Sequence, residues 1–267
     1  MSRTVCEIHA ANRIAWDEAA YEYELRIPAA IEFIRSGQIN LLQNERDALG
    51  SLEGCRRAIH LQCASGRDTL SLWNLGASEV VGVDISERHI ANARRLSDAV
   101  GAPALWYNSD VLDVDASLDG TADLVYTGKG ALVWLFDLKR WGEVVARLLR
   151  PGGRFYVFDG HPAEWLFDDT ASDWTVSKHS YFSGVEETKG WPSSYLTKFE
   201  RPEELQNSKF ARVWTIADIV MALISAGLEL KMLGEHPTRY WESFPKIPEA
   251  AQEQIPRTFS LLAIRPK

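Results

Sequence analysis

Apolar and polar positions along the chain follow two different periods. Short apolar runs typical of buried strands occur at residues 58–63, 79–84, 104–110, 122–128, 154–160, 228–233 and 258–264. Between several of these runs the apolar positions recur with a helical period, which in RWGEVVARLLR gives Trp141, Val144, Val145, Leu148 and Leu149. Strands that alternate with helices predict an α/β fold, with a mainly parallel sheet covered by helices on both faces.

Two segments fall outside this alternation. Residues 1–57 have a helical pattern and are expected to form an N-terminal helical cap, while residues 58–267 form the main domain. Residues 161–213 form a long insert after the fifth strand, and we expect it to cover the substrate site. A solvent-side subdomain or a dimer surface remains an alternative for this insert. Its aromatic residues are Trp165, Phe167, Trp174, Tyr181, Phe182, Trp191, Tyr195, Phe199 and Phe210.

Parallel α/β sheets bind ligands at the carboxyl ends of their strands, so the residues at those ends are the candidates for chemistry. The first strand leads into a turn of mostly small residues, 63–68, which opens a helix whose free N–H groups can face a polar ligand. Asp84 ends the second strand, where a carboxylate can accept hydrogen bonds from both hydroxyls of a ribose. Asp110 ends the third strand and Thr127 lies at the end of the fourth.

The ordered series HLQCASGRDTLSL, VVGVDIS, NSDVLD, ADLVYTGKGAL and LLRPGGRFYVF resembles the motifs of class I S-adenosylmethionine-dependent methyltransferases, over roughly residues 56–160. The resemblance implies a Rossmann-like fold, with a mostly parallel seven-stranded sheet and an antiparallel final strand. It also implies S-adenosyl-L-methionine as the cofactor, with Asp84 binding the ribose and Asp110 the adenine. The cofactor-binding residues that it implies are Gln62, Cys63, Ala64, Gly66, Asp84, Ile85, Asp110, Val111 and Thr127.

The first motif departs from the family pattern. His60 stands where the family has an acidic residue, and Gln62 and Ala64 replace the first two glycines, while Gly66 is kept. The sequence therefore does not identify the side chain that holds the methionine end of the cofactor. Arg67 is a candidate for pairing with the carboxylate of the cofactor, and Tyr21 or Trp16 is a candidate for closing over the cofactor. A structural role is the alternative for each of these residues.

Composition narrows the possible partners. Acidic residues outnumber basic ones 37 to 29, the formal net charge is -8, and no basic run exceeds two residues, so we expect no nucleic-acid partner. No apolar run is long enough to span a membrane and no secretory signal is visible, which predicts a cytoplasmic protein without a membrane partner. The three cysteines have no metal-binding spacing, so no metal is expected. A homodimer is possible.

Histidines are the candidates for proton transfer. His161 follows the fifth strand on the ligand side, and we expect it to act as the general base, with a role in fixing the loop before the insert as the alternative. His236 is a weaker candidate, and His9, His89 and His179 are expected at the surface.

The sequence thus favours S-adenosylmethionine-dependent methyl transfer to O, N or C of a small, partly aromatic metabolite. The alternatives are a nicotinamide-dependent oxidoreductase and a non-catalytic protein that binds S-adenosylmethionine.

Overall fold

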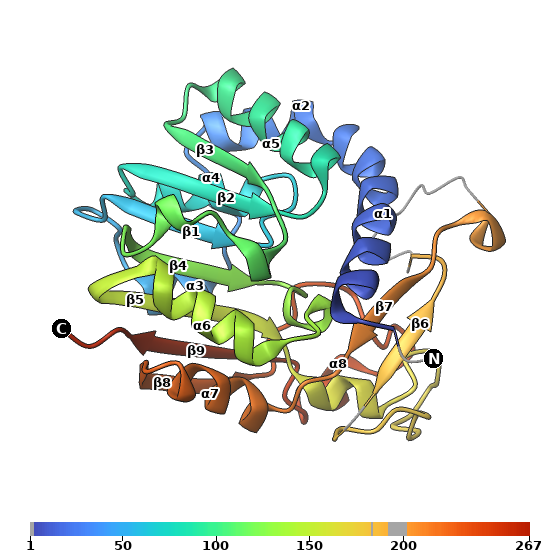
Figure 1. The fold of residues 1–267 in the computed structure, drawn as a ribbon. Helices are drawn as coiled ribbons and strands as arrows, with labels where there is room; N and C mark the ends of the chain where they lie inside the picture. Colours follow the sequence, from blue (N-terminus) through green and yellow to red (C-terminus); the bar gives the residue numbers. More distant parts are fainter. Residues whose placement is uncertain (1–2, 183, 192–201) are drawn as a thin grey trace.

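A computed structural model describes residues 3–182, 184–191 and 202–267. The strands of the main sheet are β1 Arg57–Leu61, β2 Glu79–Asp84, β3 Ala104–Asn108, β4 Ala122–Gly128, β5 Leu149–Gly160, β8 Glu229–His236 and β9 Thr258–Ile264. They lie in the order β3-β2-β1-β4-β5-β9-β8, and only β9 runs antiparallel to its neighbours (Figure 1). The predicted Rossmann-like, mostly parallel seven-stranded sheet with an antiparallel final strand is confirmed.

Helices cover both faces of this sheet, as predicted. On one face lie α2 Ile27–Arg35, α3 Gln43–Leu49, α4 Arg67–Asn74 and α5 Glu87–Val100, whose apolar residues share one buried cluster. The other face is covered by α6 Leu138–Leu148 and α7 Ile216–Ser225. The apolar stripe predicted for α6 is buried, with Trp141 fully inaccessible to solvent. The last helix is the short α8 Glu249–Gln252.

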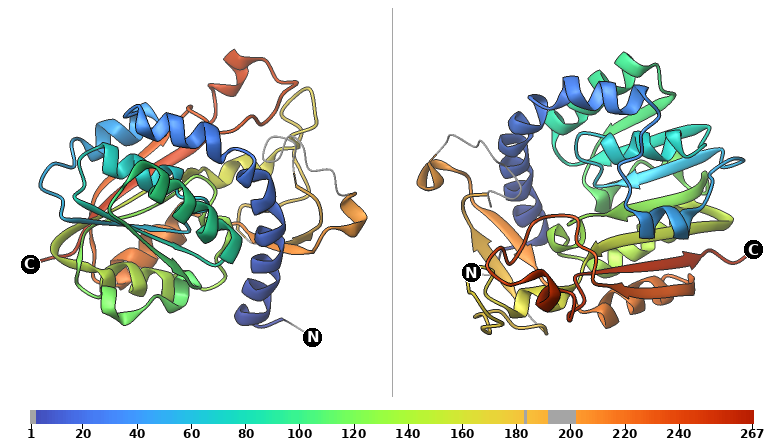
Figure 2. Two further views of the ribbon diagram at one scale, coloured as in Figure 1. Left: turned by 90° about the horizontal axis from the view of Figure 1, so that it is seen from above. Right: turned by 180° about the vertical axis from the view of Figure 1, so that it is seen from behind.

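Two elements stand apart from the sheet, at the carboxyl ends of its parallel strands. Helix α1 Val5–Glu24 runs between the sheet and a hairpin formed by β6 Val185–Thr188 and β7 Lys209–Arg212 (Figures 1 and 2). The Asn12 side chain on α1 exchanges two hydrogen bonds with the Phe210 backbone on β7, at 2.9 and 2.7 Å. The sequence pattern did not reveal this hairpin. Tyr195 and Phe199 of the insert lie outside the described residues.

Several predicted element ends differ in the structure. The third strand ends at Asn108 because the Asp110 side chain accepts a hydrogen bond from the Leu112 amide at 2.9 Å and starts a 3-10 turn. Strand β5 begins at Leu149, earlier than predicted, and β8 continues to His236. Thr215 and Asp218 form a capping box at the start of α7.

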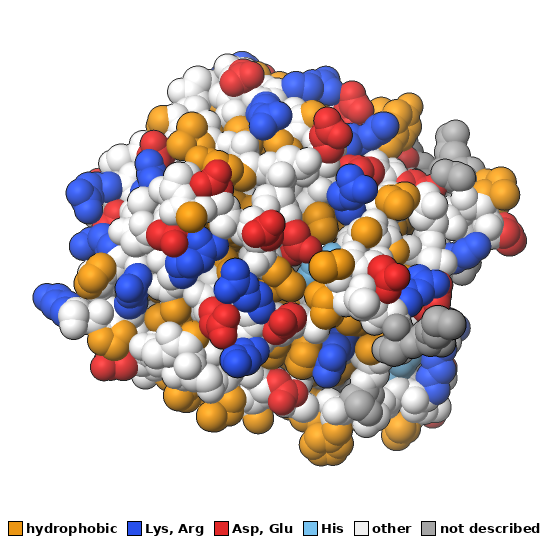
Figure 3. Space-filling model, viewed as in Figure 1, with side chains coloured by type: hydrophobic (Ala, Val, Ile, Leu, Met, Phe, Trp, Pro, Cys, Tyr) orange, Lys and Arg blue, Asp and Glu red, His pale blue; other side chains and the backbone are white. Residues whose placement is uncertain are grey.

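Acidic and basic side chains are interspersed over the face of the molecule drawn in Figure 3. Among the described residues, no helix combines the length and apolar character that crossing a membrane requires.

Trp106 of β3 fixes the packing between the sheet and α5. Its indole Nε1 donates to Ser97 Oγ at 3.0 Å, and its ring fills the space beside two glycines. A Cβ on Gly66 would lie 2.5 Å from the Trp106 ring, and one on Gly82 would lie 2.2 Å from it. The size of this tryptophan is therefore the main reason that both positions are glycine, with Ala93 Cβ 2.9 Å from the Gly66 position and Cys63 Sγ 2.8 Å from the Gly82 position as further close contacts. Gly66 also has a φ of 80°.

We expect Gly82→Ala to lower the free energy of unfolding by about 1–3 kcal/mol, because the added methyl group overpacks the core against Trp106. The loss should shrink when Trp106→Leu is present, since the smaller side chain leaves room for the methyl group. Denaturant unfolding of the two single variants and the double variant measures this coupling. If the stability losses of the two single variants simply add in the double variant, Trp106 is not the reason that position 82 must be glycine.

Candidate functional site

A cavity of about 230 Å³ lies at the carboxyl ends of β1–β4 and is closed on one side by α1. Seven residues predicted from the sequence line it: Gln62, Cys63, Ala64, Asp84, Ile85, Asp110 and Val111. Gly66 and Thr127 are not among its lining residues, although Thr127 is fully buried in β4. The structure thus brings together the ends of three strands and the turn after β1, as the sequence predicted.

The turn after β1 adopts glycine-like geometry without its glycines. Gln62 has a φ of 58° and Ala64 a φ of 45°, both in the left-handed region that non-glycine residues rarely adopt. Surrounding bonds hold this conformation: the Ala64 amide donates to Asp84 Oδ2 at 2.8 Å, and Gln62 Nε2 donates to the Ala131 carbonyl at 2.8 Å. The strain is therefore maintained by contacts with β2 and with the loop after β4.

Asp84 is almost fully buried at the end of β2. Its Oδ2 accepts from the Ala64 amide and its Oδ1 accepts from the Ser86 amide at 2.9 Å. Each carboxylate oxygen has two lone pairs, so both oxygens keep one position for a ligand. Burial raises the pKa of Asp84 to about 6. The folded protein then holds this proton more tightly than the unfolded chain, so ionisation of Asp84 destabilises the fold as the pH rises from about 4 to about 6.

Asp110 faces the same cavity and is joined to α1. His9 Nδ1 and Asp110 Oδ2 are 2.6 Å apart, a contact between residues that are 101 positions apart in sequence. Burial alone would raise the pKa of Asp110, but the hydrogen bonds from His9 and from the Leu112 amide outweigh burial and lower it. Asp110 is therefore ionised at neutral pH, and its bond to His9 holds α1 over the cavity.

Buried histidines line this cavity, contrary to the prediction that His9 and His89 lie at the surface. They are 4% and 1% exposed, and His60 is 3% exposed. Burial lowers the pKa of His60 to about 4 and that of His89 to about 3, so both rings are neutral at pH 7. Buried polar atoms without a hydrogen-bond partner among the described residues include, from the lining of this cavity, His9 Nε2, His60 Nε2, Gln62 Oε1, His89 Nε2 and Trp134 Nε1. An unpaired buried polar group is unfavourable, so these atoms fit a polar ligand.

A charged pair occupies the end of the cavity beside α4. Lys129 Nζ lies 3.1 Å from Asp68 Oδ2, 3.5 Å from the buried Glu45 Oε2 and 2.9 Å from the Asn40 carbonyl. Lys129 and Asp68 both line the cavity. The sequence analysis missed this pair; the signals were an acid in the first turn of α4 and a lysine directly after β4. Arg67, by contrast, is exposed and stacks 4.1 Å above the Phe33 ring, away from the cavity.

A second, larger cavity of about 530 Å³ adjoins the first. Gly130 and Trp134 line both. Aromatic side chains dominate its walls: Trp134, Trp165, Phe167, Trp191, Trp214, Tyr240, Trp241, Phe244 and Phe259.

Three tryptophan rings lie where the two cavities meet. The ring of Trp16 on α1 lies 5.3 Å from that of Trp134 and 4.5 Å from that of Trp191. Trp16 lines the first cavity, Trp191 the second and Trp134 both, so the boundary between the cavities is aromatic.

Asp159 at the end of β5 holds the wall that both cavities share. Its carboxylate accepts from the amides of Gly130, Leu132 and Gly160, and from the Tyr240 hydroxyl at 3.1 Å. These bonds fix the loop after β4 and fix one ring of the second cavity. Burial raises the pKa of Asp159.

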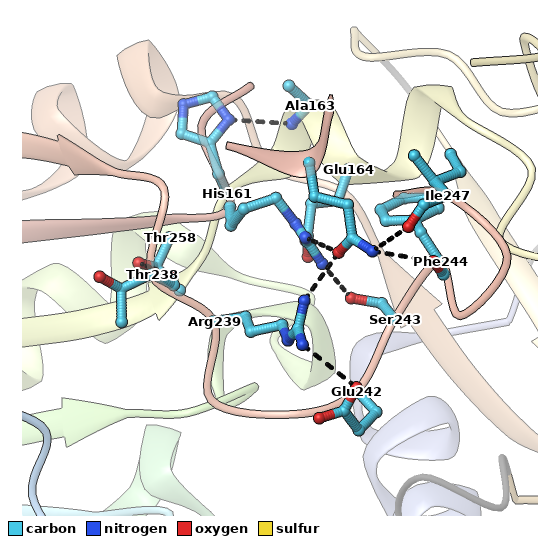
Figure 4. Close-up of polar contacts among 12 residues, drawn as sticks. His161, Ala163, Glu164, Thr238, Arg239, Glu242, Ser243, Phe244, Ile247 and Thr258 are labelled. Atoms are coloured by element: carbon cyan, nitrogen blue, oxygen red, sulfur yellow. Dashed lines mark hydrogen bonds and ion pairs between the residues drawn. The ribbon is translucent and has the colours of Figure 1, made fainter. Parts of the chain in front are cut away.

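The loop between β8 and β9 forms another wall of the second cavity and is anchored by a buried arginine. Arg257 donates to Glu164 of the insert, to Ser243, and to Gln252 Oε1 at 2.6 Å (Figure 4). Arg239 joins the same network through Gln252 at 2.8 Å. The network ties the start of the insert to the C-terminal loop.

Among the described residues, no group of three or more His, Cys, Asp or Glu is arranged to hold a metal ion.

A comparison with known families concerns the part of the chain that forms most of the first cavity. A family model described as a methyltransferase domain matches residues 59–155, which supply most of its lining. This part of the chain thus resembles a methyltransferase domain. Solved structures with this fold include S-adenosylmethionine-dependent methyltransferases, and the unpaired polar atoms of the first cavity fit that cofactor. A comparison with curated proteins found no match.

The methyltransferase domain shares its fold with solved structures. An S-adenosylmethionine-dependent methyltransferase from Mesorhizobium loti has a TM-score of 0.62 and 21% identity, covering 82% of this chain and 95% of that one. A methyltransferase from Methanosarcina mazei has a TM-score of 0.57 and 16% identity, covering 85% and 98%. The [4+2]-cyclase SpnF also has a TM-score of 0.57, with 16% identity over 83% and 80%. At these identities the likeness concerns the fold.

The contacts of His161 match the alternative role weighed from the sequence. It is buried, lines neither cavity, and uses both ring nitrogens: Nδ1 accepts from the Ala163 amide at 3.1 Å, and Nε2 lies 2.7 Å from Glu235 Oε1. Burial lowers its pKa, against the opposing effect of Glu235. The role of general base stays a prediction, whereas a loop-fixing role has direct contacts. His236 binds Ser260 at 2.8 Å and also lines neither cavity.

Replacing His161 separates these two roles. We expect His161→Ala to lower the free energy of unfolding by about 1 kcal/mol or more, because the 3-10 helix Pro162–Leu166 loses its cap. His161→Asn should recover much of this loss, since asparagine also caps helices. Thermal unfolding of both variants measures the effect. If His161→Ala is as stable as the wild type, the loop-fixing role is contradicted. If His161→Asn folds but no longer transfers methyl groups, the result supports His161 as the general base.

Proposed function

We propose that the protein transfers the methyl group of S-adenosylmethionine to O, N or C of a small, partly aromatic molecule. The observation that carries this proposal is the pair of adjoining cavities, which share Gly130 and Trp134. One contains the residues expected to bind the cofactor, and the other offers a largely aromatic space for an acceptor. The insert, 161–213, contributes many residues to the second cavity, which supports its proposed role as a cover over the substrate.

The nucleoside half of the cofactor fits the two acidic strand ends. We assign Asp84 to the ribose, because each of its oxygens keeps a free lone pair for a hydroxyl. Asp110, ionised and fixed by His9, is assigned to the adenine amino group. Ile85 and Val111, the residues that follow these acids, supply apolar walls, and the proposed contacts of Gly66 and Thr127 stay predictions.

The methionine half fits the opposite end of the same cavity. Asp68 and Lys129 provide a carboxylate and an ammonium group at this end, which suit the amino and carboxyl groups of the cofactor. The turn residues Gln62, Cys63 and Ala64 line the same cavity as this pair and Asp84. Gln62 Oε1 and His60 Nε2 are available as acceptors or donors there.

Methyl transfer requires alignment more than acid–base chemistry. Bound S-adenosylmethionine supplies an electrophilic methyl group on its sulfonium, and displacement is in line with the leaving sulfur. In this chain, the loop held by Asp159 and the three tryptophans at the cavity boundary orient the acceptor. Helix α1, fixed by His9 and Asn12, shields the cavity from water. Four expectations from the sequence stay predictions: the identity of the acceptor, the homodimer, the lack of a nucleic-acid partner and the cytoplasmic location.

A non-catalytic or non-methylating role is the second candidate, because the [4+2]-cyclase SpnF shares this fold. The two candidates differ in their products: methyl transfer converts S-adenosylmethionine into S-adenosylhomocysteine in the presence of an acceptor. Acceptor-dependent formation of S-adenosylhomocysteine therefore separates them.

The role of Asp84 is tested by binding of S-adenosylhomocysteine. We expect Asp84→Asn to weaken binding about 10- to 100-fold, because charge-assisted hydrogen bonds to the ribose are lost. Ribose hydroxyls donate to the ionised carboxylate, so wild-type affinity should fall roughly tenfold per pH unit below the pKa of about 6. Calorimetry at pH values above and below 6 measures both effects.

The matched control is Asp98→Asn, which removes an exposed carboxylate on the far turn of α5 and should leave binding unchanged. The Asp84→Asn variant should also lose the pH dependence. No binding by the wild-type protein, or unchanged affinity after the loss of Asp84, would refute the proposed function.

A further inference from the structure

The second cavity contains a buried carboxylate that has no cationic partner. Asp159 is 2% exposed and lines this cavity, and no lysine or arginine pairs with it among the described residues. All four of its hydrogen-bond donors are neutral: three backbone amides and the Tyr240 hydroxyl. These four bonds favour the charged form of the carboxylate, against burial, which raises its pKa, and no cationic side chain among the described residues balances the negative charge.

Of the four other acidic side chains of the cavity wall, Asp169 is exposed to solvent and the other three have cationic partners. Glu164 pairs with the buried Arg257, and Glu186 lies 3.2 Å from Lys178. Glu242 lies 3.4 Å from Arg239. The two lysines of the wall contact backbone carbonyls: Lys189 binds that of Glu204 at 3.4 Å, and Lys209 binds that of Gly190. Among the described residues of this wall, Asp159 is thus the buried carboxylate without a cationic side chain in contact, and a cationic ligand can balance its charge.

The surroundings of Asp159 also suit a cation with an aromatic body. The Tyr240 ring is joined to the carboxylate through its hydroxyl, and it lies 4.2 Å from the Trp241 ring. Trp134, whose buried indole N–H has no hydrogen-bond partner among the described residues, lines the same cavity. Aromatic faces attract cations and stack on flat rings, so walls of this kind recognise both parts of an arylalkylamine.

We propose that the acceptor is a cationic amine with an aromatic body, and that Asp159 selects its positive charge. The inference rests on the proposed function, since it names the class of molecule that the second cavity takes. Asp159 acts as a specificity-determining residue and at the same time holds the loop after β4. The negative charge of Asp159 could instead stabilise the sulfonium of the cofactor, but Asp159 lines the second cavity and not the first.

Three probes with the same ring test the charge preference: tryptamine, a cation; 3-ethylindole, neutral; and indole-3-propionate, an anion. Each is titrated by calorimetry into the full-length protein saturated with S-adenosylhomocysteine. We expect tryptamine to bind at least about tenfold more tightly than 3-ethylindole, with indole-3-propionate the weakest. Equal affinities, a preference for the anion, or no saturable tryptamine binding in the millimolar range would overturn the proposal.

Asp159→Asn should abolish the preference for tryptamine while preserving the shape of the side chain. Glu229→Gln is the matched control, because it removes an exposed charge, paired with Lys231 on β8, and should keep the preference. Thermal unfolding checks that each variant folds. If Asp159→Asn does not fold, the affinities of the three probes for the wild-type protein test the proposal.

Cofactor binding keeps the two proposals distinguishable. If the wild-type protein fails to bind S-adenosylhomocysteine, the proposed function fails; if it binds but shows no charge preference among the probes, only the amine assignment fails. A selective loss of affinity for S-adenosylmethionine over S-adenosylhomocysteine in Asp159→Asn, with the probe preference intact, would assign the charge to the sulfonium and overturn the inference.

Discussion

The geometry of the site depends on a buried carboxylate at the end of β5. Asp159 collects the amides of Gly130, Leu132 and Gly160, so the loop after β4 is fixed by charge-assisted hydrogen bonds. That loop forms the wall between the two cavities, and its Ala131 carbonyl in turn holds Gln62 in the strained turn after β1. A buried charge of this kind is unfavourable unless its bonds are complete, which makes the arrangement all-or-none. The position of the second cavity relative to the first thus depends on this one side chain.

Helix α1 closes the site through polar contacts with three distant parts of the chain. His9 binds Asp110 at the end of β3, Asn12 binds the Phe210 backbone of the hairpin, and Asp17 accepts from Ser86 Oγ at 2.7 Å at the start of α5. The helix packs through small buried residues, so its position is set by these specific bonds as much as by apolar area. The same helix therefore connects the cofactor cavity with the insert and couples the two halves of the site.

The sequence predicted the parts of the molecule that depend on local pattern. Strand and helix periods, together with the rule that parallel strands present ligands at their carboxyl ends, placed Asp84 and Asp110 in one cavity. The same reasoning failed for His9 and His89, because their burial results from packing between α1 and the sheet, which no local period encodes. Gly66 resembled a ligand-binding glycine by its motif, yet its lack of a side chain is required by Trp106, which lies 40 residues away in sequence.

The protonation states of the buried histidines determine the charge of the cofactor cavity. Because burial keeps His60 and His89 neutral at pH 7, neither ring offsets the carboxylates of Asp84 and Asp110, and Lys129 is already paired with Asp68 and Glu45. Asp84 and Asp110 therefore face the cavity without a compensating charge from these two rings, which suits a cofactor that carries a sulfonium and an ammonium group. Methyl transfer removes the sulfonium charge, so the cavity attracts the methyl donor more strongly than the demethylated product. The position where the family has an acidic residue is thus occupied by His60, whose ring is neutral because of burial that only the folded chain provides.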